Sequence, residues 1–598
     1  MIRKKEQGSI LSPILFEIKI NSIVENLNPN MDSSLYVDDF CVCYSSRGGM
    51  PLLERQIQLQ LGKLETWANE NGFKFSPTKT TAVHFCEKRK CVREPDLYLY
   101  KSRLPVNDNV RFLGVILDKR LSFLPHIKDL RVRCLNALNA LRIFCSPKWG
   151  GTSDILLNLY RSIVRSKLDY ASFIYGSARE SYVNMLDPIH NQGIRLALGA
   201  FRTSPVESLY AEANEPPLHL RRRKLRQQYL MKLYSNPENP AFNCAFKISK
   251  VTERFYEANP KKIPPLGIRA KDDFEDTDLD LEVEKFNFPK TPPWTMPEVS
   301  VDFSVASHEK STTSPQEYKK HFNELCKKYP NYNQIFTDGS KSEDGVGAAC
   351  FSASGERQKG LNFCSSIFSA EASALEMAVD SAKASTERKH LILSDSLSLL
   401  RAIKSKNLKD MRILRIYEKL VKVENRGKTV VFAWIPGHSD IQGNEQADYL
   451  AKESAKLRIS REMKMPPSDF KPVFKREMAA RFNNNWGGIS RNKLLEIMPN
   501  ICPRKPVSLP RELEILITRL KIGHTAYTHK FLLEGEPPPE CVGCDERISV
   551  KHILIDCIDF QDVRKKYYKT TSLKALFDVV DPMRILGFVR EIGLIGKL

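Results

Sequence analysis

The spacing of apolar residues divides the chain into stretches of different character. Up to about residue 120, helical spacing alternates with short runs rich in β-branched and aromatic residues, such as 35–44 and 80–85. This pattern predicts an α+β unit over residues 1–120. From 121 to 235, apolar residues recur every three or four positions, which predicts a helical unit that ends in a basic helix at 220–233.

Prolines become frequent in the next stretch, residues 236–330, which also contains an acidic run at 272–284. This composition is typical of a linker, and we expect the segment to be partly disordered. Regular patterns return at Tyr332, where three strand-like runs precede a helix, a strand, a helix, another strand and a final helix. We therefore predict an α/β-type unit at 331–458. The last region, 459–598, is mixed and has one clear helix near 511–520.

Charge is the property of the composition that says most about partners. The 598 residues include 92 lysines and arginines against 71 acids, a net charge of +21. This excess favours a polyanion, above all nucleic acid, over a small acidic substrate. The basic helix suits a phosphate backbone, but a solvated helix face explains it equally well. Its basic run consists of Arg221, Arg222, Arg223 and Lys224.

The cysteines and the apolar runs bear on the compartment. Fourteen cysteines are scattered without the dense, even spacing of a secreted disulfide scaffold, which indicates a reducing environment. No run of about eighteen apolar residues is found, and the first residues do not lead into a secretory signal. We therefore expect an intracellular, soluble protein with no membrane partner, and leave open whether it is nuclear or cytoplasmic.

Four acids stand in separate predicted strands and helices: Asp338, Glu371, Asp395 and Asp448, with His438 ten residues before the last. Taken singly, each has a plain structural explanation as a turn residue, a first-turn helix charge or an N-cap. Taken together, they could hold two divalent ions, because hydrolysis by two metals needs several carboxylates to offset the repulsion between the ions. Oxygen ligands select Mg²⁺ or Mn²⁺ over zinc.

The segments around these acids read T-D-G-S, A-E-A, S-D-S and P-G-H followed by G-N-E-x-A-D. In this order and spacing, residues 334–454 resemble the ribonuclease H family. The resemblance implies a mixed five-stranded sheet flanked by helices, and cleavage of the RNA strand of an RNA–DNA hybrid. It also implies that the four acids are metal ligands, that His438 assists proton transfer or product release, and that Asn444 contacts the hybrid.

An earlier motif, Tyr36-Val37-Asp38-Asp39, lies between apolar residues. With Q-G-S and L-S-P before it, and G-F-K and F-L-G after it, it resembles the catalytic hairpin of reverse transcriptases. The resemblance implies part of a polymerase palm followed by a helical thumb. The family has a third catalytic aspartate on an earlier strand, and we expect this chain to begin after it. Little DNA synthesis is then expected, unless another chain supplies that acid.

A third motif lies near the end of the chain, Cys541-x2-Cys544-x7-His552-x4-Cys557. Three thiolates and one imidazole at this spacing predict a structural zinc site; the alternative is four unrelated buried residues. The preceding segment, 516–533, contains Arg519, His524 and His529 and is similar to the tail of Jockey-like non-LTR retrotransposons.

The order of palm, thumb, linker, nuclease and zinc tail also resembles the polyproteins of that group. We expect a piece of such a polyprotein without the upstream endonuclease and fingers. Its leading predicted activity is hybrid cleavage. A catalytically inactive remnant that still binds an RNA or DNA template is the main alternative.

Overall fold

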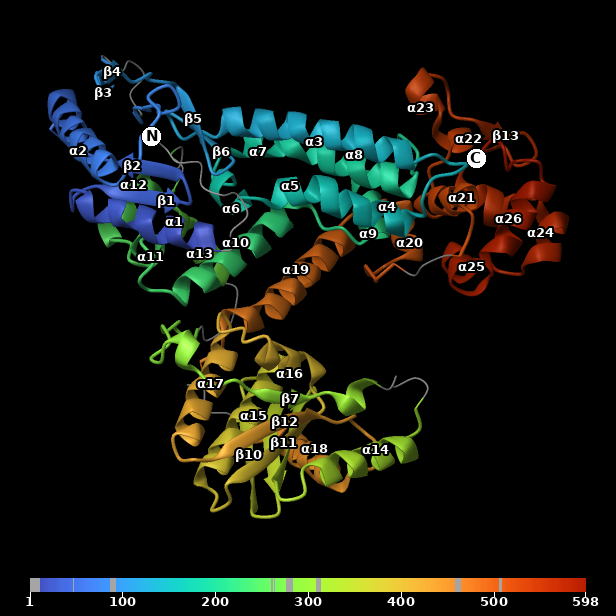
Figure 1. Cartoon of the computed structure of the whole chain (residues 1–598). Coiled ribbons are helices and arrows are strands. Elements are labelled where there is room, and N and C mark those ends of the chain that lie inside the picture. Colours follow the sequence, from blue (N-terminus) through green and yellow to red (C-terminus); the bar gives the residue numbers. More distant parts are fainter. Residues whose placement is uncertain are drawn as a thin grey trace. The chain divides into compact units, whose positions relative to one another are not determined.

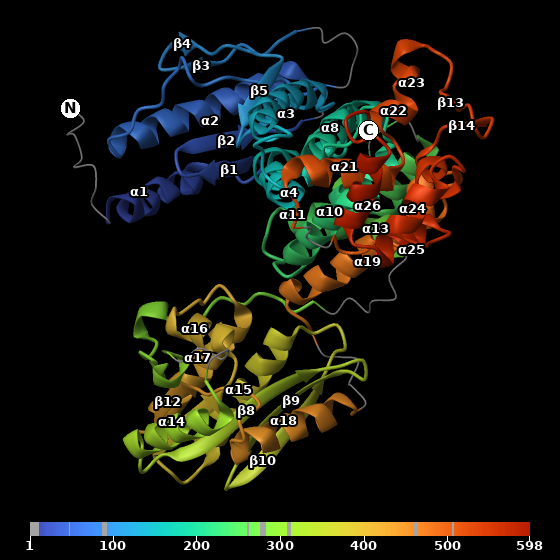
Figure 2. The same ribbon diagram turned by 90° about the vertical axis from the view of Figure 1, so that its right-hand side faces the viewer.

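The computed structural model describes the chain except for residues 1–10, 47, 87–92, 260–261, 263, 276–282, 308–312, 458–463 and 505–507. The Q-G-S motif and most of the acidic run after Asp272 lie outside the described residues. The chain forms two compact units. Unit 1 combines Met1–Leu218 with Trp486–Leu598, and unit 2 is His219–Asn485 (Figure 1). Figure 2 shows the same elements from a second direction.

Unit 1 begins with a small α+β layer, as predicted. A tight hairpin pairs Tyr36 with Asp39, and Trp67 of the long helix behind it stacks on Phe73 with 5.3 Å between ring centroids. The predicted strand at 80–85 is reduced to one bridge between Ala82 and Val106, so that prediction is wrong. The elements are α1 (Leu11–Asn21), β1 (Asp32–Tyr36), β2 (Asp39–Cys43), α2 (Met50–Glu70), β3 (Tyr98–Leu99), β4 (Ser102–Arg103), β5 (Asn109–Phe112) and β6 (Val115–Asp118).

Helices follow, which confirms the helical spacing read from the sequence. The longest of them buries Ile127, Leu130, Cys134, Leu138 and Leu141, three or four positions apart on one face. The helices are α3 (Leu124–Phe144), α4 (Ser153–Tyr160), α5 (Ser166–Asp169), α6 (Ser172–Tyr175), α7 (Glu180–Val183), α8 (Asp187–Leu198) and α9 (Val206–Ala213).

The C-terminal residues pack against these helices within unit 1. Arg511 donates to Ser153 Oγ at 2.7 Å and to the Ala197 carbonyl at 2.7 Å, and the Ser153 N–H donates to Glu514 at 2.9 Å. The elements are α20 (Lys493–Ile497), α21 (Arg511–Ile522), α22 (Ala526–His529), α23 (Phe531–Glu534), β13 (Glu540–Cys541), β14 (Glu546–Arg547), α24 (Gln561–Tyr567), α25 (Leu573–Val579) and α26 (Pro582–Glu591).

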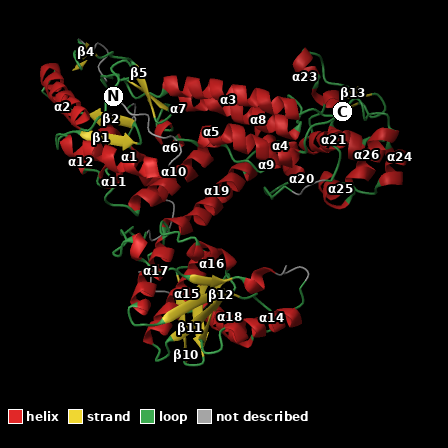
Figure 3. Cartoon of the chain, in the orientation of Figure 1, coloured by secondary structure: helices red, strands yellow, loops and turns green. Residues whose placement is uncertain are grey.

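Unit 2 is built on a mixed sheet (Figure 3). Its strand order is β10-β9-β8-β11-β12-β7, with β8, β9 and β10 antiparallel and β8, β11, β12 and β7 parallel. There are six strands rather than the five expected. They are β7 (Ser300–Asp302), β8 (Asn333–Lys341), β9 (Val346–Ser352), β10 (Gly355–Leu361), β11 (Lys389–Ser394) and β12 (Thr429–Trp434).

Helices cover both faces of the sheet. Ala348 of β9 packs against Ala370 of α15, whereas its neighbour Ala349 packs against Ala451 of α18, and successive strand residues point to opposite faces. Strand β11 is buried on both sides, which its unbroken apolar run Leu391–Leu393 indicated. The helices are α15 (Ile367–Ala384), α16 (Leu397–Lys404), α17 (Met411–Glu424) and α18 (Gln442–Ala455).

The stretch interpreted as a linker contains regular elements in its described residues. Strand β7 extends the sheet, and Tyr318 and Leu325 of α14 are buried in the core of unit 2. Helix α14 begins with a capping box of Ser314 and Glu317. This helix signal was missed because the stretch was interpreted from its prolines. The helices of this stretch are α11 (Ala241–Phe246), α12 (Lys250–Ala258), α13 (Leu266–Glu275) and α14 (Pro315–Lys328); α10 (Leu218–Tyr234), just before it, is the predicted basic helix.

Helix α19 (Phe470–Gly487) continues this core beyond the predicted boundary at 458. Phe470 and Phe474 are fully buried in a cluster with Cys364. Asp469 accepts hydrogen bonds from Ser366 Oγ at 2.8 Å and from Arg412 at 3.3 Å. Residues 464–485 therefore belong structurally to unit 2. None of the described helices is long and apolar enough to cross a membrane.

Candidate functional site

Three of the four predicted acids meet where β8 and β11 lie side by side. One carboxylate oxygen from each of Asp338, Glu371 and Asp395 lies within 4.8 Å of the other two. Asp338 is inside β8, and Asp395 directly follows Ser394, the last residue of β11. Ser394 pairs with Thr337, which precedes Asp338 in β8. The parallel register therefore places the two aspartates next to each other.

Two glycines allow the backbone to approach these acids closely. A Cβ on Gly339 would lie 2.6 Å from the backbone nitrogen of Glu371, so only glycine lets the first turns of α15 pack on β8. A Cβ on Gly437 would lie 2.4 Å from Asp395 Oδ2, so a larger residue there would displace the Asp395 carboxylate. Trp434 holds the Asp395 carbonyl with a 3.0 Å hydrogen bond from its ring N–H.

The cluster is strongly unfavourable as a set of free anions. Asp338 and Glu371 are each 7% exposed, and Glu371 Oε2 is buried with no hydrogen-bond partner among the described residues. Burial, followed by the charges of Asp395 and Asp448, raises the pKa of Asp338 to about 8. Burial, followed by Asp395 and Asp338, raises the pKa of Glu371 well above its usual range. A buried oxygen without a donor and crowded carboxylates fit a bound divalent cation.

The fourth acid, Asp448, belongs to an adjoining group with His438 and Glu445, whose ligand atoms lie within 4.8 Å of one another. The charge of Asp448 contributes to the raised pKa of Asp338, so the two groups adjoin. Asp448 also accepts from Lys452 at 2.6 Å. It lies in the second turn of α18 and not at the helix start that we predicted, because the helix begins at Gln442.

Glu445 is a site residue that the sequence analysis missed. It stands three positions before Asp448 on the same helix, and residues at this spacing share a face. The glutamate of the G-N-E motif could therefore have been predicted from the sequence as a site residue. His438 is exposed in the loop after β12, where its φ of +57° places the backbone in the left-handed region.

Asn444 and the basic helix, predicted to bind nucleic acid, are partly or fully buried in unit 2. Asn444 is 2% exposed, so its side chain is not available to a duplex in this conformation. Arg223 of α10 is half-buried and forms ion pairs with Asp273 at 3.6 Å and Glu477 at 3.4 Å, which gives it a structural role. Its neighbours Arg221, Arg222 and Lys224 are also half-buried rather than fully solvated.

Asp38 and Asp39 lie at the exposed end of the β1–β2 hairpin. The predicted hairpin is confirmed, with Val37 at φ +57° in its two-residue turn. Among the described residues, the groups of three or more potential metal ligands do not include these two aspartates. Within the described ranges, no third acid therefore lies close enough to form a metal-ligand group with them.

The four predicted zinc ligands do converge. The ligand atoms of Cys541, Cys544, His552 and Cys557 lie within 4.8 Å of one another. The Cys557 sulfur is 3.8 Å from that of Cys541 and 3.9 Å from that of Cys544. Sulfurs placed about 2.3 Å from a tetrahedral zinc are separated by about 3.8 Å. Both ring nitrogens of His552 are buried without a hydrogen bond among the described residues, so the donor set fits such an ion.

Comparisons with known proteins agree with two of these regions. Residues 3–117 match the family described as reverse transcriptase (RNA-dependent DNA polymerase), and residues 330–456 match the RNase H family. A solved structure, LC11-RNase H1 in complex with an RNA/DNA hybrid, is 18% identical. The similarity covers 20% of this chain and 95% of that one, with a TM-score of 0.17, which adds nothing to the sheet order described above.

Curated relatives come from mobile elements of Drosophila melanogaster. A probable RNA-directed DNA polymerase from transposon X-element is 28% identical over 32% of this chain and 21% of its own length. The RNA-directed DNA polymerase from mobile element jockey is 22% identical over 39% of this chain and 26% of its own length. The aligned part thus spans about a quarter or less of these relatives. The two family matches and these relatives together support a Jockey-like non-LTR retrotransposon polyprotein, with a reverse transcriptase segment before a ribonuclease H segment.

Proposed function

We propose that unit 2 hydrolyses the RNA strand of RNA–DNA hybrids with two divalent cations, Mg²⁺ or Mn²⁺. The observation that carries this proposal is the convergence of Asp338, Glu371 and Asp395, two of them buried, within 4.8 Å. Their oxygens, together with Asp448, would hold the cations. When bound, such ions supply an activated water and neutralise the charge that develops on the leaving oxygen.

The residues of the chain have separate tasks in this proposal. Asp338 and Asp395 are fixed by the backbone of neighbouring strands, so their oxygens are positioned before any substrate arrives. Glu371, on α15, contributes a carboxylate oxygen that has no hydrogen-bond partner among the described residues. His438, exposed and next to Glu445 and Asp448, is placed to carry a proton between the site and solvent.

Cleavage of a labelled RNA–DNA hybrid in Mg²⁺ tests the proposal. The whole chain should cut the RNA strand, and Asp338→Asn should lower the rate by about 100-fold or more, because it removes a ligand with little change in shape. Asp344→Asn, an exposed acid in the turn between β8 and β9, is the matched control and should cut like the unmodified chain. Absence of cleavage by the unmodified chain would reject the proposal.

We also propose that Cys541, Cys544, His552 and Cys557 bind a structural zinc ion. The sulfur separations of 3.8 and 3.9 Å support this assignment, as does the buried ring of His552, whose nitrogens form no hydrogen bond among the described residues. All four positions are filled by protein, which is typical of a structural rather than a catalytic zinc. The ion would tie the β13–β14 hairpin to the segment that carries His552 and Cys557.

A second candidate function, template binding without DNA synthesis, is favoured by the isolation of Asp38 and Asp39. With two carboxylates on an exposed turn, the repulsion between two cations would be poorly offset. Primer extension with the same protein sample tests this expectation. Measurable synthesis would show that a further acid reaches the hairpin, for example from another chain.

A further inference from the structure

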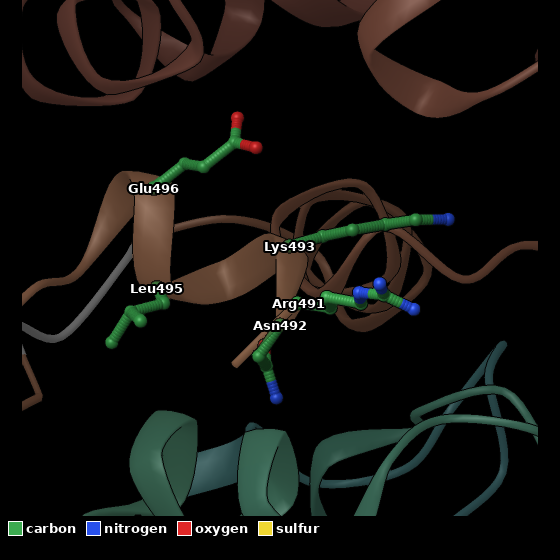
Figure 4. Close-up of a pocket in the computed structure, with 5 residues that line it drawn as sticks. All are labelled: Arg491, Asn492, Lys493, Leu495 and Glu496. Carbon is green, nitrogen blue, oxygen red and sulfur yellow. The ribbon is translucent and has the colours of Figure 1, made fainter. Parts of the chain in front are cut away.

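A hollow beside α20 in unit 1 is lined by basic side chains (Figure 4). Its volume is ≈ 340 Å³. In Figure 4, Arg491 and Lys493 extend toward the same side, and the Glu496 side chain extends above them. The hollow is lined by Arg491, Asn492, Lys493, Leu495 and Glu496.

Lys493 is held in place by a stacked pair of histidines. Its Nζ lies 3.1 Å from His529 Nε2, and the rings of His529 and His524 stack with centroids 3.7 Å apart. A lysine ammonium only donates, so Nε2 accepts and the ring proton is on Nδ1, 2.7 Å from Thr528 Oγ1. His529 is therefore neutral and fixes the position of the amine without neutralising it.

The surrounding charges are positive. Burial, then Lys493 and Arg547, lower the pKa of His524 to about 4. Burial, then His524, Lys493 and Arg547, lower that of His529 to about 3. Arg547 of β14 lies over the ring of Phe531, 4.9 Å from its centroid. The histidines add no charge at neutral pH, but Lys493 and Arg547 are close enough to oppose any charge on them.

Glu496, which also lines the hollow, offsets the charge of Lys493 only in part. Among the described residues, Arg491, Lys493 and Arg547 have no carboxylate within 4.0 Å, whereas the nearby Arg504 and Arg511 both pair with Glu514. Burial and Arg547 lower the pKa of Lys493. A half-buried amine beside a second cation is unfavourable until an anion binds between them.

We propose that Arg491, Lys493 and Arg547 form a binding site for the phosphodiester backbone of nucleic acid. The cations come from two elements, the turn before α20 and the β13–β14 hairpin, so they present an extended charged edge rather than a closed pocket for a small ion. Arg547 is stacked on an aromatic ring, which keeps its guanidinium oriented for phosphate. This site lies in unit 1 and goes beyond the proposed hydrolysis in unit 2.

Chemical footprinting tests the site on the folded protein. The full chain carrying Asp338→Asn, which prevents cleavage, is treated with an amine-acylating reagent with and without a 20-nucleotide single-stranded RNA. Bound RNA should slow the acylation of Lys493 several-fold and leave exposed Lys574 unchanged. Equal acylation of Lys493 with and without saturating RNA would overturn the proposal. Protection by inorganic phosphate but not by RNA would also overturn it, in favour of a small-anion site.

Binding measurements separate this site from the general positive charge of the chain. In the same background, R491Q, K493Q and R547Q together should weaken RNA binding at least tenfold. They should also reduce the slope of log affinity against log salt by about 2 to 3. The control removes three exposed lysines elsewhere in unit 1, through K565Q, K569Q and K574Q, and should weaken binding less than threefold. Equal losses of affinity in the triple variant and in the control would refute a specific site. If the triple variant folds poorly, K493R is measured instead and should retain binding, because it keeps the positive charge. Because cleavage is not measured, failure of the proposed nuclease does not affect this test.

Discussion

Replacing Asp338 by asparagine should stabilise unit 2 when divalent cations are absent, although it should abolish hydrolysis. The substitution keeps the size of the side chain and removes one charge from a group of buried carboxylates. Its neighbours Asp395 and Asp448 oppose ionisation of Asp338, and its burial adds to this effect. The site is therefore expected to oppose folding of the metal-free chain.

The size of the effect follows from the pKa of Asp338, which rises from 3.8 to about 8. Because the pKa in the folded state lies above that in the unfolded state, the carboxyl group does not lower the free energy of unfolding below pH 3.8. The reduction then grows with pH and levels off near pH 8. At about 1.36 kcal/mol per pH unit, it is just over ~4 kcal/mol at pH 7 and just under ~2 kcal/mol at pH 5. Asp338→Asn should recover most of this free energy of unfolding.

The assay is pulse proteolysis in increasing urea with EDTA, following peptides of β8 to β12 by mass spectrometry so that unit 2 is measured alone. The advantage of Asp338→Asn over the unmodified chain should be about 3 kcal/mol larger at pH 7 than at pH 5. Asp344→Asn should stay within about 0.5 kcal/mol of the unmodified chain. Added Mg²⁺ should stabilise the unmodified chain more than Asp338→Asn. A variant no more stable than the unmodified chain at pH 7 would refute the repulsion argument.

Three further outcomes are expected. Cys557→Ser should lower the zinc content of the purified chain, measured by elemental analysis, and expose residues 540–557 to protease; unchanged zinc would reject the predicted ligand set. Gly339→Ala should destabilise unit 2 by about 1 to 3 kcal/mol in urea unfolding and slow hybrid cleavage, because its methyl group meets the backbone of Glu371. Glu514→Gln should destabilise unit 1 by about 3 to 5 kcal/mol, since buried Arg511 loses its carboxylate; a loss below 1 kcal/mol would show that Arg511 finds another partner.

Much of the local structure could be predicted from the sequence, because apolar spacing reports which face of an element is buried. The spacing over 121–235 predicted helices, and the helix that buries Ile127 to Leu141 is one of them. Strand β7 could not be predicted in this way, because three residues are too few to show a period of two. The helix α14 was missed because its capping box lies among prolines and charges.

For the candidate sites, the sequence by itself determined which residue types were present and which family pattern they follow. It identified the four acids, His438 and the four presumed zinc ligands, all of which lie in metal-capable groups in the structure. Only the tertiary structure decided their grouping. It placed Asp448 in an adjoining group with His438, added Glu445 to that group, buried Asn444 and assigned Arg223 to internal ion pairs.

The same division holds for the whole chain. Local sequence determines helices, strands and turns because the groups that select them are a few positions apart. The register of β8 and β11, which joins Asp338 to Asp395, and the packing of Arg511 against Ser153, 358 positions away, depend on side-chain fit between distant segments. That fit is a property of the assembled core, so only the tertiary structure could decide it.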